Sequence, residues 1–330
     1  MIPIFVSAQH DIPYFHWQIE LYINNFRNKG IPIENINVIL SIPQNAEKPS
    51  KGGRNLKNKY KNVYFYKDER DRKNYIPSIK PYLISKWLKD DPERGRCFFL
   101  HDSDIIFNYL PDYSELINDR VNYLSDTIGY IGYNYLTNTS ENYEKIHSEL
   151  EKNNLIKIMS KVIGINPKII EYNQSNAGGA QYLLKNQTVQ LWEKIYKDST
   201  KLYDETISFD RKYPIKTGQL QFWTAEMWSI LWNLWYFGHS TRISDKMNFS
   251  WATDNLDIFE NRPIFHLSGV TEKEREKFFY KGDYINKNPI ETLIKDSNAF
   301  TYIEEKNATN KYIDNIRDFI QKTKSSDNYN

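Results

Sequence analysis

The sequence predicts an α/β fold in which a mixed, mainly parallel sheet is flanked by helices. The first observation is that short apolar runs alternate with segments of helical periodicity over roughly the first hundred residues. Such strand–helix alternation is typical of parallel sheets whose faces are covered by helices. The second is composition: 40% of the residues are hydrophobic and 26% are charged, the balance of a globular protein. A length of 330 residues allows one large domain or two modest ones.

The elements of the first hundred residues follow from their apolar spacing. Apolar side chains recur every three or four positions over residues 15–28, which predicts a helix that Gly30 ends. Residues 43–62 are rich in Lys, Asn and Gly without an apolar period, so we expect a mobile loop there. Strands are expected at residues 4–8, 37–42, 63–66 and 97–100, and a second helix at residues 78–88.

The pattern is looser after residue 107. Residues 128–133 alternate like a strand, and residues 141–163 have a helical pattern. The remaining expectations are a turn at 175–181 leading into a strand at 182–184, helices at 188–198 and 221–237, strand ends at 249–254 and 263–267, and a frayed tail over 324–328. No linker or repeat divides the sequence.

Composition excludes several classes of function. The single cysteine, Cys97, excludes an internal disulfide framework and a cysteine-based zinc site, and its place in an apolar run predicts an inert buried thiol. A net charge of +2 gives no basic field for nucleic acid, although a modified base stays open as an acceptor. No window resembles a transmembrane segment or a signal peptide, so we expect a cytoplasmic protein.

The stretch CFFLHDSDIIF, residues 97–107, places two carboxylates between apolar runs. In an extended segment Asp102 and Asp104 point to the same side and Ser103 to the other. Adjacent carboxylates repel unless a cation joins them, and oxygen ligands suit Mg²⁺ or Mn²⁺. The alternative is a simple Asp-Ser-Asp turn, but the flanking apolar runs place the acids at the end of a strand, where α/β sheets bind ligands.

These residues resemble the DxD strand of GT-A fold, nucleotide-sugar-dependent glycosyltransferases. Residues 176–179, NAGG, are similar to a segment of the retaining family 8 enzymes, and residues 264–269, IFHLSG, are similar to their late His-x-x-Gly. Residues 221–228, QFWTAEMW, with the later 251–254, WATD, more faintly resemble hydroxyproline O-arabinosyltransferases and peptidyl-serine galactosyltransferases. The matches occur in a consistent order. The Lys-Pro-Trp that follows His-x-x-Gly in family 8 is missing, so its lysine is either Lys273 or Lys281.

The resemblance implies a GT-A, Rossmann-like catalytic domain over residues 1–285 and a helical extension over residues 286–330. It implies Mn²⁺ (or Mg²⁺) as the cofactor, held by Asp102, Asp104 and His266, and a UDP-sugar as the donor. The residues expected to bind substrate are Gln9, Lys80, Ser103, Asn176, Gly178, Gly179 and Lys281. The expected catalytic residues are Glu226, Gln181 and Asp254.

Structural alternatives exist for most of these residues. His101 is expected to be structural, because it points away from its neighbour Asp102 on a strand. The glycine pair at 178–179 forms either a tight turn or a close approach to substrate. Glu226 is either an acid facing the donor sugar or an ordinary partner of a lysine or arginine, and Asp254 is the second candidate.

The leading hypothesis is a metal-dependent glycosyltransferase, a hexosyl- or pentosyltransferase, acting with retention. Its acceptor is the hydroxyl of a glycan, a protein or another molecule. If the enzyme inverts instead, Glu226 or Asp254 becomes the general base. The alternatives are a metal-dependent phosphohydrolase or nucleotidyltransferase, which usually needs further acidic ligands, and a non-catalytic carbohydrate-binding protein.

Overall fold

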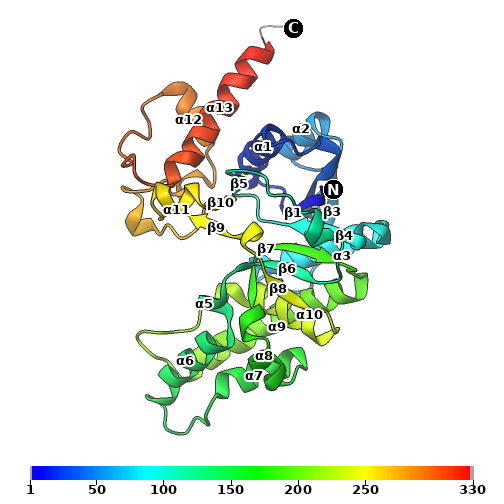
Figure 1. Cartoon of the computed structure of the whole chain (residues 1–330), viewed down its shortest axis with the longest axis vertical. Helices are drawn as coiled ribbons and strands as arrows, with labels where there is room; N and C mark the ends of the chain where they lie inside the picture. Colours follow the sequence, from blue (N-terminus) through cyan, green and yellow to red (C-terminus); the bar gives the residue numbers. More distant parts are fainter. Residues whose placement is uncertain (1, 328–330) are drawn as a thin grey trace. The chain divides into compact units, whose positions relative to one another are not determined.

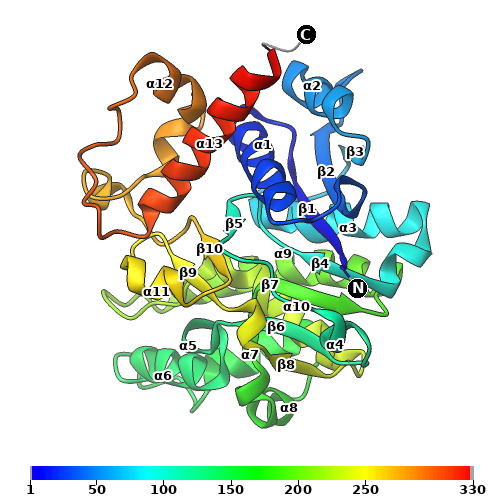
Figure 2. The same ribbon diagram turned by 45° about the horizontal axis from the view of Figure 1, so that its top comes forward.

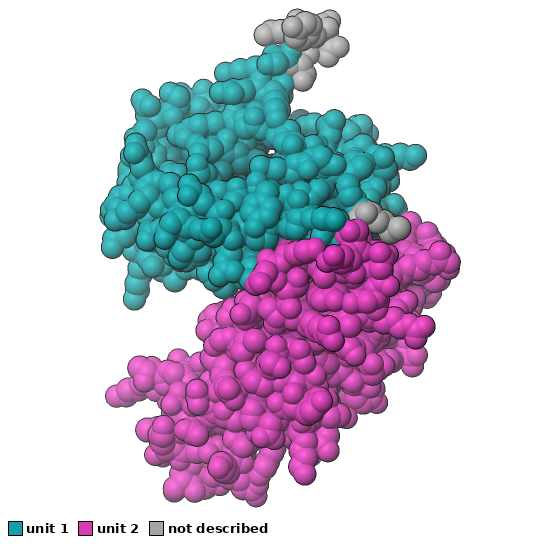
Figure 3. Space-filling view, in the orientation of Figure 1, with its two compact units in different colours: residues 1–67, 101–113, 248–330 teal, residues 68–100, 114–247 magenta. Residues whose placement is uncertain are grey.

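The computed structural model describes residues 2–327 and contains two compact units, coloured separately in Figure 3. Unit 1 consists of residues 1–67, 101–113 and 248–330, and unit 2 of residues 68–100 and 114–247. Each unit therefore combines segments that are far apart in the sequence. Both units contain strands packed with helices, which confirms the expected α/β class (Figure 1). The domain boundary expected between residues 285 and 286 stays a prediction.

Unit 1 contains two groups of paired strands. The first has the order β3-β2-β1, in which β1 pairs with β2 in parallel from Phe5↔Ile36 to His10↔Ser41. The second is a three-stranded sheet of order β5-β10-β9, in which β10 is antiparallel to β5 and parallel to β9. Their bounds are β1 (Ile4–His10), β2 (Ile36–Pro43), β3 (Val63–Asp68), β5 (Ile105–Phe107), β9 (Phe249–Trp251) and β10 (Ile264–His266).

The helices of unit 1 come from both the first and the last part of the sequence, and helices from the two parts pack against one another. They are α1 (Pro13–Asn28), α2 (Lys51–Lys59), α11 (Leu256–Glu260), α12 (Pro289–Lys295) and α13 (Thr309–Asp327). Helix α1 contacts α2, β5 and α13, and Figure 2 shows α1 and α13 side by side. The expected tail at 324–328 is helical up to Asp327, and residue 328 lies outside the described residues.

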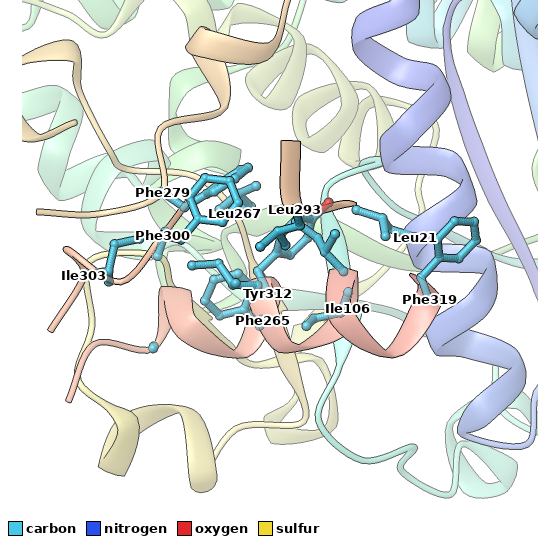
Figure 4. Packing of buried hydrophobic residues seen from close by; sticks show 14 of the residues in the cluster. Leu21, Ile106, Phe265, Leu267, Phe279, Leu293, Phe300, Ile303, Tyr312 and Phe319 are labelled. Carbon is cyan, nitrogen blue, oxygen red and sulfur yellow. The ribbon is translucent and has the colours of Figure 1, made fainter. Parts of the chain in front are cut away.

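The core of unit 1 is an aromatic-rich cluster built around α13 (Figure 4). Tyr312 lies at its centre, with its ring 6.1 Å from Phe265, 6.0 Å from Phe279 and 6.3 Å from Trp17. Phe265 directly precedes His266 on β10. The C-terminal helix therefore packs against the strand that carries a proposed metal ligand.

Unit 2 contains a four-stranded group of order β4-β7-β6-β8. Strand β7 is antiparallel to both β4 and β6, whereas β6 and β8 are parallel, and a bulge interrupts the β6–β7 register between Leu124 and Asp126. The strands are β4 (Cys97–Leu100), β6 (Asn122–Asp126), β7 (Gly178–Lys185) and β8 (Thr241–Ile243). The helices are α3 (Ile79–Asp90), α4 (Ser114–Ile117), α5 (Ile128–Ile131), α6 (Tyr133–Glu144), α7 (Asn154–Ile163), α8 (Pro167–Tyr172), α9 (Val189–Lys212) and α10 (Ala225–Tyr236).

The long helix α9 organises the helical layer of unit 2. It contacts α3, α7 and α10, and α10 in turn contacts β7. Thr188 caps α9, because its side chain accepts a hydrogen bond from the backbone N–H of Leu191 at 3.2 Å. No helix within residues 2–327 is both long and apolar enough to cross a membrane. The cytoplasmic location expected from the sequence stays a prediction.

Four predicted elements are wrong in whole or in part. The helix expected over 141–163 is interrupted, because α6 ends at Glu144 and α7 begins at Asn154. The turn expected over 175–181 is shorter, because β7 already begins at Gly178. The expected loop at 43–62 contains helix α2, whose start is fixed by Ser50: its hydroxyl accepts from Gly53 N–H at 3.0 Å and donates to Asp11 Oδ1 at 2.7 Å. The expected strand at 128–133 is helix α5 followed by the start of α6, and the strand lies earlier, at β6. Asp126 ends that strand, because its side chain accepts from Ile128 N–H at 3.1 Å and turns the chain.

Candidate metal centre and substrate-binding residues

The two acids lie in the connection between β4 and β5. The expected extended backbone is wrong here, because Ser103 and Asp104 form a turn between Leu100 and Ile105. Ser103 is buried, and its hydroxyl donates to Gln18 Oε1 at 2.7 Å, which ties the turn to α1. Hence a turn, rather than strand alternation, directs Asp102 and Asp104 to the same place.

Strand pairing brings His266 to the acids from a distant part of the sequence. On β10, His266 lies opposite Ile105 of β5, and the next backbone N–H, of Leu267, donates to the carbonyl of Asp104 at 2.9 Å. On its other side β10 pairs with β9, where Trp251 is the partner of His266. The Trp251 ring stacks on the imidazole at 6.1 Å between centroids and 13° between planes. The imidazole is thus oriented by backbone pairing and by ring stacking.

The three side chains form one compact group of possible metal ligands. His266 Nε2 lies 3.2 Å from Asp104 Oδ1 and 3.6 Å from Asp102 Oδ2. One ligand atom from each residue falls within 4.8 Å of the others. The side chains of Asp104 and His266 are 6% and 8% exposed, whereas that of Asp102 is 32% exposed. The group therefore opens to solvent on the side of Asp102.

Lys281 supplies the positive charge that the buried carboxylate needs. Its ammonium forms an ion pair with Asp104 Oδ2. Burial alone would raise the pKa of Asp104, but Lys281 and His266 outweigh burial and hold this pKa well below its ordinary value. Burial alone would lower the pKa of Lys281, and Asp104 reverses that effect. The unfavourable desolvation of Asp104 between two apolar strands is thus offset by its ion pair with Lys281, which lies nearly two hundred residues later in the sequence.

The neighbouring candidates in unit 1 have structural contacts. His101 is fully buried, with its ring 5.0 Å from Tyr22 and 5.1 Å from Phe26, which is the structural position expected for it. Gln9 is buried near the end of β1, and its Nε2 donates to Ser7 Oγ at 3.4 Å. Asp254 closes the turn after β9, because its Oδ2 accepts from Trp251 N–H at 2.8 Å.

In unit 2, Lys80 and Glu226 form an ion pair, with Lys80 Nζ 3.4 Å from Glu226 Oε1. Both side chains are largely buried. The backbone N–H of Glu226 donates to Tyr75 Oη at 2.8 Å, and Tyr75 Oη donates to the carbonyl of Trp223 at 2.7 Å. Glu226 therefore has the lysine partner that its structural alternative required. Its catalytic role and the nucleotide-binding role of Lys80 stay predictions.

The glycine pair lies inside β7 and is packed tightly by protein atoms. A Cβ on Gly178 would lie 2.4 Å from the Ser125 carbonyl, and one on Gly179 would lie 2.7 Å from the terminal methyl of Met227. The adjacent Gln181 is fully buried and its Oε1 accepts from Ser125 Oγ at 2.8 Å.

Asn176 precedes β7, and its carbonyl accepts from Thr241 Oγ1 at 2.9 Å. Gly178 thus packs against a backbone carbonyl, whereas Gly179 packs against the side chain of Met227. The substrate-facing role expected for this segment stays a prediction.

Sequence reasoning missed two features. Trp251 was part of a recognised motif, but its stacking on His266 depends on the parallel pairing of β9 with β10, which the sequence does not reveal. The second feature is a cavity in unit 2 beside α6. Its sequence signal is the recurrence of asparagine at 134, 138 and 142, which places three carboxamides on one face of a helix.

Comparisons with known proteins give structural similarities only. No protein-family model matches the chain. No curated protein matches it either. Among solved structures, the chain is similar to the bifunctional glycosyltransferase WbbM in its apo form, with 12% identity, 89% of this chain and 51% of that chain covered, and a TM-score of 0.42. It thus spans about half the length of that protein.

A second similar structure is a glycosyltransferase involved in the glycosylation of the major capsid of PBCV-1. Here the identity is 9%, the coverage is 83% of this chain and 97% of that chain, and the TM-score is 0.39. Similarity at this level assigns neither a family nor an activity to the chain.

Proposed function

We propose that this chain is a metal-dependent glycosyltransferase that moves a sugar from a UDP-sugar to an acceptor hydroxyl, with retention of anomeric configuration. The observation that supports it is the convergence of Asp102, Asp104 and His266, whose ligand atoms lie within 4.8 Å of one another. Retention rests on the resemblance of residues 176–179 and 264–269 to family 8 enzymes. The identity of the transferred sugar, hexose or pentose, does not enter the proposal.

The donor set fits a divalent cation. Two carboxylates and an imidazole suit Mn²⁺ or Mg²⁺, and three protein ligands leave coordination positions for a nucleotide diphosphate. The exposure of Asp102 is consistent with a ligand that approaches from this side. When bound, the cation would neutralise the diphosphate and so stabilise it as a leaving group.

The residues around the metal ligands suggest how the phosphate charge and the acceptor's proton would be handled. Lys281 touches Asp104, so we assign it, rather than Lys273, as the lysine that meets a phosphate charge beside the metal ligands. In a retaining reaction the departing phosphate takes the acceptor's proton, so no strong protein base is needed. A general base such as Glu226 or Asp254 is then not required.

The acid content of the site favours this function over a phosphohydrolase or nucleotidyltransferase. Those enzymes usually add further carboxylates to clamp one or two ions. Within the described residues, the group that contains Asp102 and Asp104 has His266 as its third member instead of another acid.

The test is an assay of UDP-sugar hydrolysis or transfer with Mn²⁺ and with EDTA. Asp104→Ala and the milder Asp102→Asn should each reduce turnover at least tenfold, and EDTA should abolish it in the wild type. Asp257→Ala, which removes an exposed acid of α11, is the matched control and should retain activity. Turnover that withstands EDTA and both variants would end the proposal.

A further inference from the structure

Unit 2 contains a cavity of about 540 Å³ that the proposed donor site does not use. It is lined by Ile128, Gly129, Asn134, Tyr135, Asn138, Thr139, Asn142, Gln174, Gly218, Gln219 and Gln221. None of these residues carries a formal charge at neutral pH, whereas 26% of the whole chain is charged. A cavity of this size is typical of small-molecule sites.

Carboxamides dominate the polar part of the lining. Asn134, Asn138 and Asn142 follow one another at intervals of four residues on α6, so they lie on one face of the helix. Gln174, Gln219 and Gln221 come from other segments of unit 2. Each carboxamide offers both a donor and an acceptor, which is the pattern that neutral hydroxyl groups require.

The walls of the cavity are held together by hydrogen bonds that leave much of this capacity unused. Asn142 Nδ2 donates to the Gly218 carbonyl at 3.3 Å, and Gln174 Oε1 accepts from Asn134 N–H at 3.0 Å. The side chain of Asn138 makes no hydrogen bond to another described residue. The cavity is therefore preorganised, with amide groups still available to a ligand.

An aromatic side chain adds an apolar surface. Tyr135 is stacked on the buried Trp228, with 6.5 Å between centroids and 21° between ring planes. Its hydroxyl accepts from Gln221 N–H at 3.2 Å, which fixes the ring from the other end. A rigid aromatic ring beside amides suits a ligand that is polar at its rim and apolar on its faces.

We propose that this cavity binds a neutral saccharide. The lining offers no cation to a phosphate or carboxylate, so an anion finds no opposite charge there. A pyranose ring, with hydroxyls around its edge and apolar faces, matches both the carboxamides and Tyr135. Saccharide binding at this cavity does not depend on the proposed function.

The test uses an array of neutral and anionic oligosaccharides, probed with the full chain in EDTA and without nucleotide. We expect binding to neutral glycans. The affinity for the strongest neutral glycan should fall at least tenfold in Asn138→Ala and in Gln219→Ala. The matched controls are Asn118→Ala and Gln190→Ala, which remove exposed amides elsewhere in unit 2 and should change affinity less than twofold. Circular dichroism and the unfolding temperature of each variant show that the fold is intact.

Three results would overturn the inference: no glycan bound, preferential binding of anionic glycans, or undiminished affinity in both cavity variants. The outcome is separable from that of the donor site. If Mn²⁺ and UDP fail to bind, the proposed sugar-transfer function is refuted, but glycan binding at the cavity can still be measured. If donor binding holds and the cavity variants bind glycan normally, only the present assignment falls.

Discussion

Replacing Tyr312 by phenylalanine should stabilise the protein. Tyr312 is fully buried in the core of unit 1, and its hydroxyl has no hydrogen-bond partner among the described residues. Burial, with the nearby charge of Asp104, raises the pKa of Tyr312 well above its ordinary value, so the buried hydroxyl stays neutral. A buried polar group without a partner costs about 1–3 kcal/mol. Tyr312→Phe removes that cost and keeps the ring contacts.

Truncation at the same position should have the opposite effect. Tyr312→Ala removes the ring that packs on Phe265, and loss of a buried aromatic ring costs about 3–5 kcal/mol. Because Phe265 precedes His266 on β10, this variant should also bind Mn²⁺ more weakly than the wild type. Tyr312→Phe should bind it normally.

Calorimetry measures the effect on stability. We expect the unfolding temperature of Tyr312→Phe to rise by about 1–2 °C for each kcal/mol gained. Tyr302→Phe, which removes a half-exposed hydroxyl, is the control and should change little. A lower unfolding temperature for Tyr312→Phe would show that the hydroxyl is bonded in the core, and the reasoning would be refuted.

Three further predictions concern unit 2. Burial raises the pKa of the Cys97 thiol to about 11, so iodoacetamide at pH 8 should alkylate native Cys97 roughly 100-fold more slowly than the unfolded chain, from the thiolate fraction alone. Burial alone would raise the pKa of Asp68, but its ion pair with Arg70 lowers it below the ordinary value; Asp68→Asn should therefore be less stable than the wild type at pH 6, and the difference should shrink as the pH falls below about 4 and through the lowered pKa of Asp68. A methyl group on Gly178 would meet the Ser125 carbonyl at 2.4 Å, so Gly178→Ala should lower the free energy of unfolding by about 1–3 kcal/mol.

Each of these predictions has a control. The Cys97 thiol is half-buried rather than fully buried as expected, and equal alkylation rates in the native and unfolded chains would contradict its raised pKa. A stability difference between wild type and Asp68→Asn that does not shrink as the pH falls from about 4 to about 2 would contradict the ion pair as its cause. Gly129→Ala, where an added Cβ meets nothing within 4 Å, should be tolerated, and equal effects at both glycines would contradict the packing argument.

The sequence predicted elements well where the apolar period was strong. The helix at 15–28 and the strands around 4–8, 37–42 and 97–100 are all present, with bounds that differ by a few residues. Helix α2 was missed because it buries little: Leu56 is its one large buried side chain, and the helix depends on the Ser50 cap. Short amphipathic helices of this kind lack the apolar repeat that reveals longer ones.

The candidate metal centre was predicted in its members but not in its construction. Asp102 and Asp104 were expected to converge by strand alternation, whereas a turn held by Ser103 brings them together. His266 reaches them through the antiparallel pairing of β5 with β10, which joins segments about 160 residues apart. Pairing over such distances, and the ion pair between Lys281 and Asp104, depend on tertiary structure that no local pattern encodes.

Anomalous X-ray diffraction from crystals grown with Mn²⁺ and UDP tests the central claim most directly. We expect one strong manganese peak about 2.0–2.6 Å from carboxylate oxygens of Asp102 and Asp104, with His266 Nε2 as a further ligand and the diphosphate completing the shell. A peak located elsewhere, or none at saturating Mn²⁺ and UDP, would contradict it.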